Sequence, residues 1–226
     1  MRRHSELTEL MDDPDCDVNL LKRTYHLFPY VNRLFSQWST IYRLEIKPHL
    51  QDRNHLYTLL DVGSGLMDNS FFVQKLATND GFKLKITGID PNPMVSRLIE
   101  EKSLSSLAEF KSCYLHDLDE AKKFDFIISN HLLHHLQPSE VKSILAEIQS
   151  RTKIKAIMND IHRSRIAWCA FGVIMSPFRF GSFIQRDGLT SIKKSYTSDE
   201  MLALATEDWR IRKLFPYRYS LIYDNH

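Results

Sequence analysis

The chain has 226 residues, of which 43% are hydrophobic and 26% are charged, and its formal net charge is +2. A chain of this length can bury a full core, so one domain with a small accessory element is expected. Composition of this kind excludes a disordered or low-complexity protein. The small net charge, without a basic face, does not favour nucleic acid as a partner.

Three isolated cysteines, Cys16, Cys113 and Cys169, have no paired spacing. They therefore suggest neither a disulfide framework nor a zinc ribbon, and a reducing cytoplasm fits them best. The first residues lack the layout of a signal peptide. The strongest apolar run, residues 166–175, is too short to span a bilayer. We therefore expect a cytoplasmic protein without stable membrane insertion, present as a monomer or homodimer.

Residues 1–50 form a predicted helical arm. Between residues 18 and 50 the apolar side chains recur at helical spacing. Pro29 lies inside this pattern, where a proline removes a backbone donor and clashes with the preceding turn. The pattern therefore predicts two helices with a bend near Pro29, the second ending before Pro48.

Beyond the arm, short apolar segments alternate with helical ones. The predicted strands cover residues 57–62, 84–90, 109–114, 124–129, 155–160, 211–214 and 219–223, and crossover helices cover 71–77, 93–102 and 139–150. This alternation predicts an α/β fold with a doubly wound, mostly parallel seven-stranded sheet. We expect residues 51–226 to form this domain, with a helical lid insertion at 163–195. Thr197 and Glu200 are spaced as a capping box that opens a last helix.

A glycine turn follows the first predicted strand. Gly63 and Gly65 lie where a ligand binds in a doubly wound sheet, at the carboxyl end of a strand. Glycine permits positive φ and lets the backbone approach a ligand closely. A plain tight turn is the alternative, but the position between an apolar strand and a helix favours a binding loop.

Asp90 ends the second predicted strand. Its carboxylate would lie where the ribose of a nucleoside-containing ligand would bind, and it could accept both ribose hydroxyls. The alternative is that Asp90 caps the helix that starts near Pro91 or Pro93. Both roles are compatible with each other.

Asp68 argues against a dinucleotide as the ligand. The dinucleotide fingerprint would have a third glycine at this position, opening a helix whose N-terminus holds a pyrophosphate. A carboxylate there would repel that anion. S-Adenosylmethionine has no phosphate and carries a cationic sulfonium, so Asp61 and Asp68 can remain beside it.

With these motifs in order over residues 57–160, the sequence resembles the class I S-adenosylmethionine-dependent methyltransferases. It is most similar to those of ubiquinone and menaquinone biosynthesis, in the run from Leu59 to Gly65, the run from Ile86 to Met94 and the run from Phe124 to Leu136. The resemblance implies a Rossmann-like methyltransferase fold, S-adenosylmethionine as cofactor and S-adenosylhomocysteine as product. The cofactor-binding residues that it implies are Asp61, Gly63, Ser64, Gly65, Asp90, Pro91, Asn92, Asp117, Leu118, Asn130 and His131.

Within this set, the resemblance implies a place for each group. Asp61 and the two glycines would shape the methionine pocket, and Asp117 would face the adenine amino group. Asn130 and His131 would lie over the methionine end. The sequence departs from the family after the second glycine, where Leu66 and Met67 replace small residues.

Histidines are the candidates for a general base, since their pKa is suited to proton transfer near neutrality. We rank His131 and His162 equally, the latter because it follows the fifth strand. His131, His134 and His135 also have the spacing of a one-sided metal site. No cysteine or acid at suitable spacing joins them in the sequence, so we expect no metal.

Aromatic residues are concentrated in the arm and in the insertion. They predict a pocket for a small, largely apolar acceptor, aromatic, polyketide or quinone-like, methylated at a hydroxyl. The candidate pocket residues are Tyr25, Phe28, Trp38, Trp168 and Phe171. The segment from Asp187 to Tyr196 resembles bacterial small-molecule O-methyltransferases of secondary metabolism. RNA or protein methylation, and a non-catalytic module that binds S-adenosylmethionine or another ligand, stay as alternatives.

Overall fold

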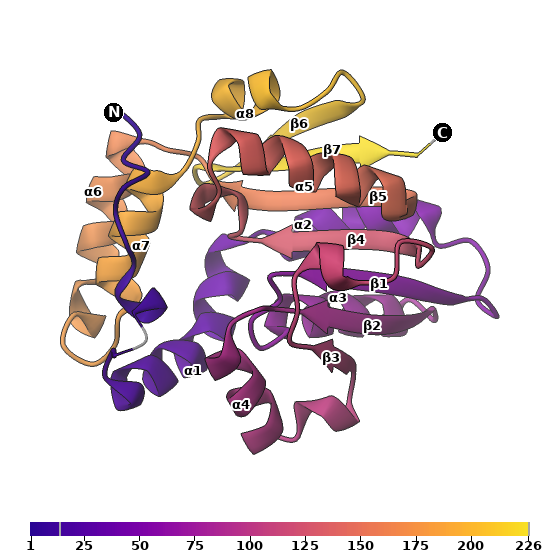
Figure 1. The fold of residues 1–226 in the computed structure, drawn as a ribbon, viewed down its shortest axis with the longest axis horizontal. Helices are drawn as coiled ribbons and strands as arrows, with labels where there is room; N and C mark the ends of the chain where they lie inside the picture. Colours follow the sequence, from indigo (N-terminus) through magenta and orange to yellow (C-terminus); the bar gives the residue numbers. More distant parts are fainter. Residues whose placement is uncertain (14, 226) are drawn as a thin grey trace.

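Five parallel strands and a C-terminal antiparallel hairpin form one sheet in the computed structural model, which describes residues 1–13 and 15–225 (Figure 1). The strands are β1 (Leu56–Val62), β2 (Lys83–Ile89), β3 (Glu109–Lys111), β4 (Phe124–Asn130), β5 (Thr152–Ile161), β6 (Trp209–Leu214) and β7 (Arg218–Asp224). Their order is β3-β2-β1-β4-β5-β7-β6, and β7 is antiparallel to both of its neighbours. The predicted doubly wound, seven-stranded fold is confirmed.

Burial on both faces explains why the central strands are apolar along their whole length. Six of the seven residues of β4 are buried, as expected for a parallel strand covered by helices on both sides. Leu59 packs into the core cluster on one face of the sheet and the next residue, Leu60, into the cluster on the other face. The third strand is shorter than predicted because β3 is an edge strand that pairs only with Thr87–Ile89 of β2.

Helices cover both faces of the sheet. One face carries α3 (Asp68–Asn79) and α4 (Pro93–Glu101), together with the N-terminal arm. The other face carries α5 (Pro138–Arg151) and α8 (Ser198–Leu204). The predicted capping box is present at the start of α8, where Thr197 and Glu200 bond to each other's backbone N–H groups.

The predicted division into two helices at Pro29 is wrong, because α1 (Val18–Phe35) runs through the proline as one helix. Proline removes a single N–H, and the helical bonding resumes beyond it, with Ser36 N donating to Asn32 O over 2.8 Å. The chain turns instead at Gln37, whose φ is 59°. It continues as α2 (Trp38–Ile41), a π-helical turn (Tyr42–Ile46) and a 3-10 turn (Lys47–His49).

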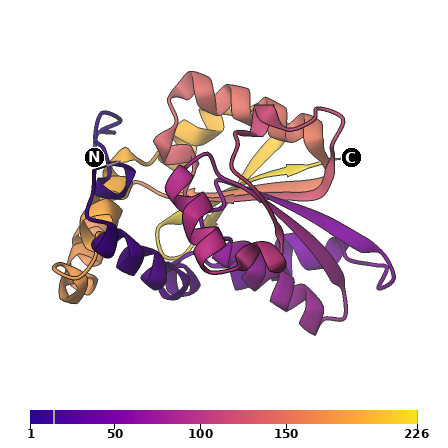
Figure 2. The ribbon, with the colours of Figure 1, turned by 60° about the horizontal axis from the view of Figure 1, so that its bottom comes forward.

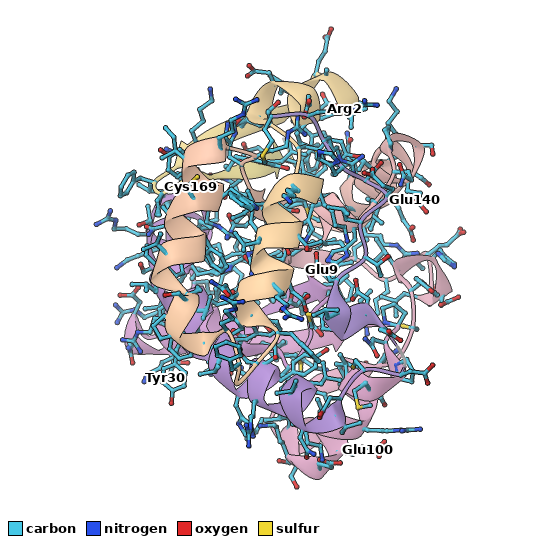
Figure 3. The ribbon with its side chains drawn as sticks, turned by 90° about the vertical axis from the view of Figure 1, so that its left-hand side faces the viewer. Arg2, Glu9, Tyr30, Glu100, Glu140 and Cys169 are labelled. Atoms are coloured by element: carbon cyan, nitrogen blue, oxygen red, sulfur yellow. The ribbon has the colours of Figure 1, made fainter. Side chains whose placement is uncertain are left out.

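Two further helices, α6 (Arg165–Ile174) and α7 (Ile184–Lys194), occupy the segment that follows β5. Figures 1 and 2 both place α1, α6 and α7 at the end of the sheet where the parallel strands terminate. The N-terminal segment, residues 1–13, runs beside α7, with Glu9 next to that helix (Figure 3). The short 3-10 turns are Leu10–Asp12, Leu104–Ser106, Leu115–Asp117, Leu133–His135 and Ser176–Phe178.

Across residues 1–13 and 15–225, no helix has both the length and the apolar character needed to cross a membrane.

Candidate active site

The turn after β1 requires its glycines. Gly63 and Gly65 have φ values of 68° and 50°, in the left-handed region that residues with a Cβ rarely adopt. The N–H groups of Gly63 and Ser64 both donate to Ile89 O, at 2.9 and 3.0 Å. These bonds hold the turn against the end of β2. A Cβ on Gly63 would also lie 3.3 Å from the Leu132 side chain.

Asp90 holds the glycine turn in place from the end of β2. Its Oδ2 accepts the N–H of Gly65 at 3.0 Å, and its Oδ1 accepts the N–H of Asn92 at 3.0 Å. Burial raises the pKa of Asp90, while these two backbone bonds lower it. Asn92, and not Asp90, caps α4, because its side chain accepts the N–H of Met94. The Asp90 carboxylate lines the cavity beyond the strand ends.

Two more carboxylates lie near the turn. Burial raises the pKa of Asp61 to about 7, and the hydroxyl of Ser70 donates to it at 2.8 Å. Asp68 opens α3 and accepts a hydrogen bond from Asn32 at 2.9 Å. With Asp90, three acids line this half of the cavity. Such a wall favours a cationic group and disfavours a pyrophosphate.

The bulky pair Leu66 and Met67 fits this geometry because of a glycine on the neighbouring strand. Met67 has a φ of 58° and is fully buried. A Cβ on Gly88 would lie 2.6 Å from the Met67 sulfur, so only glycine leaves room for this side chain. The departure from the family pattern is therefore accommodated under the turn, while Leu66 lines the cavity.

The end of β4 supplies Asn130 and His131, and both line the cavity. Asn130 Oδ1 accepts hydrogen bonds from Asn159, Trp38 and Arg218, at 2.9, 3.3 and 3.1 Å. His131 has a φ of 65°, and its Nε2 lies 2.7 Å from Nη1 of Arg218. Burial, and then the charge of Arg218, hold the pKa of His131 well below its usual range.

The tautomer of His131 follows from its partner. Arginine can only donate, so Nε2 of His131 accepts and Nδ1 carries the proton. The nitrogen that would take a proton from an acceptor is therefore already occupied by Arg218. This arrangement makes His131 a hydrogen-bond donor in the cavity and gives no support to its predicted role as a general base.

The cavity has a volume of about 690 Å³ and continues from the acids into an apolar chamber. Tyr25 and Phe28 from α1 and Phe171 from α6 contribute the aromatic surface predicted for the acceptor. Further apolar residues that line the cavity include Val31, Phe35, Ala167, Ala170, Ile174, Ile184, Ile192, Phe215 and Pro216. The predicted cofactor residues Pro91 and Asn92 also line the cavity.

Two predicted pocket residues lie outside the cavity lining. Trp38 is 2% exposed and packs beneath the site, where its indole N–H donates to Asn130. Trp168 of α6 is not among the lining residues, and the ammonium group of Lys193 lies 5.1 Å from the centre of its ring. Their roles as acceptor contacts are therefore not supported by their positions.

Three predicted cofactor or catalytic residues also fall outside the lining. The carboxylate of Asp117 accepts the N–H of Tyr114 at 2.8 Å within its own 3-10 turn, and Leu118 is buried in the core. His162 Nδ1 accepts the N–H of Ser198 at 3.2 Å and lies 2.9 Å from its hydroxyl oxygen. His162 therefore interacts with the start of α8, away from the site where we expected it to act.

A buried cluster of charged residues, which was not predicted from the sequence, lies at the cavity wall opposite the three acids. His134 is 1% exposed, and its Nδ1 lies 2.7 Å from Asp160, whose other oxygen accepts the backbone N–H of His134. Glu9 Oε1 lies 3.5 Å from His134 Nε2, an ion pair without hydrogen-bond geometry. Although burial alone would lower the pKa of His134, Asp160 and then Glu9 raise it to about 9. His134 is therefore protonated at neutral pH.

Glu9, His134 and His135 are also the group whose ligand atoms lie close enough to hold a metal ion, all within 4.8 Å. No acid lies at a suitable spacing from these histidines in the sequence, and Glu9 of the N-terminal segment supplies one. However, Lys194 Nζ lies 3.5 Å from Glu9 and 3.1 Å from His135. Its ammonium group and the His134 proton already supply positive charge, so the cluster is satisfied without a metal.

The N-terminal segment closes this wall mainly through polar contacts. Asp187 of α7 accepts the N–H groups of Leu10 and Met11, at 2.8 and 3.0 Å. Burial raises the pKa of Asp187 to about 6, while these two bonds lower it. Glu9 is the only residue between positions 1 and 13 that is fully buried, and Ser191 donates to it at 2.9 Å.

Comparison with known proteins agrees with this fold. Residues 59–155 match the family model described as a methyltransferase domain. No curated protein matches the sequence. Among solved structures, the fold is similar to a plantazolicin methyltransferase in complex with SAH (14% identity, TM-score 0.66, 96% of this chain and 93% of that chain).

The fold is also similar to that enzyme in complex with a triazolic desmethyl analog and SAH (13% identity, TM-score 0.67, 96% of this chain and 93% of that chain). A third similar structure is the magnesium protoporphyrin IX methyltransferase of Synechocystis PCC 6803 with bound SAH (14% identity, TM-score 0.56, 94% and 90% covered). Residues 59–155 therefore match a methyltransferase domain, and the chain has the seven-stranded fold of these SAH-bound methyltransferases.

Proposed function

We propose that this protein transfers a methyl group from S-adenosylmethionine to a hydroxyl oxygen of a small, largely apolar acceptor. One observation carries the proposal: a single cavity joins three carboxylates and a glycine turn to an aromatic chamber. The two halves suit the two partners of a methyl transfer, a polar cationic donor and an apolar acceptor. The acceptor class that fits the chamber is aromatic, polyketide or quinone-like.

The donor half would hold the cofactor through the residues at the ends of β1, β2 and β4. Asp90 would accept the ribose hydroxyls, and the open backbone at Gly63 and Gly65 would let the ligand approach. Asp61 and Asp68 would face its positively charged methionine end. The residues present therefore fit S-adenosylmethionine, which supplies an activated methyl group on a sulfonium when bound.

The chain's own contribution to the transfer would be alignment and exclusion of water. Transfer from a sulfonium is an in-line displacement, so positioning of the acceptor is the chief catalytic effect. The aromatic rings of Tyr25, Phe28 and Phe171 would hold the acceptor flat, and the N-terminal segment would close the chamber beside α7.

The proposal is tested with tritium in the transferable methyl group of S-adenosylmethionine and a panel of phenols and hydroxyquinones. We expect label in an organic-extractable product, and loss of that label in the Asp90→Ala variant but not in Glu120→Ala, an exposed acid. Label in RNA or protein would replace the proposal with macromolecular methylation. Cofactor binding without transfer to any acceptor would indicate a non-catalytic binding module.

A further inference from the structure

Arg218 is a buried cation on the acceptor side of the cavity. It begins β7 and pairs in register with Ile161, at the end of β5. Because β7 is antiparallel to β5, its first residue lies at the sheet edge where the parallel strands end. Arg218 is among the residues that line the cavity, although it is only 5% exposed.

The guanidinium group of Arg218 has neutral partners only. It donates from Nη1 to His131 Nε2 at 2.7 Å and from Nη2 to Asn130 Oδ1 at 3.1 Å. Its Nε is buried and has no hydrogen-bond partner among residues 1–13 and 15–225. In the same described residues, no carboxylate lies within 4.0 Å of it, whereas each of the other two buried arginines, Arg151 and Arg163, pairs with a glutamate.

The charge of Asp160 raises the pKa of Arg218, but the carboxylate oxygens of Asp160 already bind other groups. One of its oxygens lies 2.7 Å from His134 Nδ1 and accepts the N–H of Ile161, and the other accepts the backbone N–H of His134. Its charge is therefore balanced by the protonated His134. Burial lowers the pKa of Arg218 to about 10, and Asp160 only partly opposes this effect. Arg218 thus stays cationic at neutral pH without a direct counter-anion.

A buried charge without an opposite charge is costly to the fold, and in most proteins it is paired. Here the charge lies on the wall of a cavity, so a ligand can supply the missing anion. The planar guanidinium, which presents several N–H donors, is well suited to an oxygen anion.

We propose that Arg218, held by His131 and Asn130, forms a subsite for an oxyanion of the acceptor, so that the acceptor binds as a phenolate or a carboxylate. This inference rests on the proposed function and specifies the chemical class of its acceptor. An acceptor oxygen that is already ionised needs no general base on the chain. The subsite therefore accounts for the fact that neither His131 nor His162 is placed to act as one.

The probe is 4-nitrophenol, whose phenolate absorbs visible light and whose neutral phenol does not. It is titrated with pH in the presence of excess wild-type protein saturated with S-adenosylhomocysteine. A cation within a few ångströms favours the charged form of its neighbour by about one to three pH units. We expect the bound phenol to ionise at least about one pH unit lower than in free solution.

Three variants test whether Arg218 causes this shift in ionisation. Arg218→Met should abolish the shift in ionisation, Arg218→Lys should retain part of it, and Arg186→Met, an exposed arginine of α7, should leave it unchanged. Calorimetry with S-adenosylhomocysteine on each protein shows that the variants are folded. If Arg218→Met does not fold, the wild-type shift and the Arg218→Lys variant decide the question.

A second pair of probes distinguishes the two oxyanions. Benzoate binding more tightly than benzamide would identify a carboxylate acceptor, whereas a shift with 4-nitrophenol alone would identify a phenolate. An unshifted or raised ionisation of bound 4-nitrophenol without preference for benzoate would overturn the subsite, as would failure of all probes to bind at millimolar concentration. If the wild-type protein does not bind S-adenosylhomocysteine, the proposed function is wrong. That result differs from failure of the subsite alone, in which S-adenosylhomocysteine still binds.

Discussion

Glu9 Oε1 lies 3.5 Å from Nε2 of His134, and this ion pair joins the N-terminal segment to the loop after β4. On its other side His134 contacts Asp160 at 2.7 Å, so one imidazolium lies between two carboxylates. The pKa of Glu9 is lowered to about 2, because its positive neighbours, His134 first, outweigh burial. Glu9 and His134 are therefore both charged at neutral pH.

The charge of His134 makes stability depend on pH. Its pKa is raised from 6.5 to about 9 in the folded protein, so this contribution is fully present below about pH 6.5 and lost as the pH rises through 9. The free energy of unfolding of the wild type should exceed that of His134→Gln by on the order of 2 kcal/mol at pH 6. Urea unfolding at several pH values measures this difference, which should shrink towards pH 9.5.

The Glu9→Gln variant serves as a milder test of the same cluster. It keeps the imidazole but removes one of its two carboxylates, so the pH range over which stability falls should move to lower values. A difference between wild type and His134→Gln that does not change from pH 6 to 9.5 would contradict a protonated His134.

Asp187 should control the mobility of the N-terminal segment. The Asp187→Ala change removes the acceptor of two backbone N–H groups, those of Leu10 and Met11. Each such bond contributes about 1 kcal/mol, so hydrogen exchange at these two amides should become roughly tenfold faster or more. Exchange measured by mass spectrometry on the N-terminal peptide tests this, with the exposed Glu207→Ala as control. Equal rates in both variants would show that Asp187 does not anchor the segment.

Gly188 should be required for the packing of α7 against α6. A Cβ at this position would lie 2.3 Å from a ring carbon of Phe171, and overpacking of this kind costs about 1–3 kcal/mol. Alanine would recover only about 0.5–1 kcal/mol of helix propensity. Gly188→Ala should therefore lower Tm by a few degrees, roughly 2–4 °C per kcal/mol.

A second substitution, Phe171→Leu, should make room for the methyl group that Gly188→Ala adds. In the Phe171→Leu background Gly188→Ala should be neutral or stabilising, as a double-mutant cycle of thermal unfolding would show. A stabilising effect of Gly188→Ala alone would mean that the Phe171 ring does not lie against α7.

The sequence was sufficient to predict that Asp61, Gly63 and Asp90 lie close together, and all three line one cavity. They lie at the ends of strands that the apolar pattern reveals, and parallel strands bring their carboxyl ends to one edge. Glu9 and Arg218 were missed, since their neighbours come from distant parts of the chain. Arg218 could have been found from the antiparallel direction of the last strand, which places its first residue at the same edge.

Predictions from local sequence patterns were wrong at positions where contacts with distant residues determine the structure. Pro29 does not divide this segment into two helices, because α1 continues through it to Phe35. The position of His162 after β5 suggested an active-site role, yet its ring bonds to Ser198 at the start of α8. Side-chain direction depends on neighbours that spacing in the sequence does not specify.

The carboxylate of Asp90 should bind the ribose of S-adenosylmethionine in this cavity, and calorimetric titration with S-adenosylhomocysteine measures this interaction. We predict saturable binding at one site per chain. Asp90→Ala should weaken it by about 1.5–3 kcal/mol, roughly 10- to 100-fold, because a bond to a charged acceptor is lost. Glu120→Ala should bind like the wild type. An unchanged affinity in Asp90→Ala, or no binding to the wild type at millimolar ligand, would contradict the account.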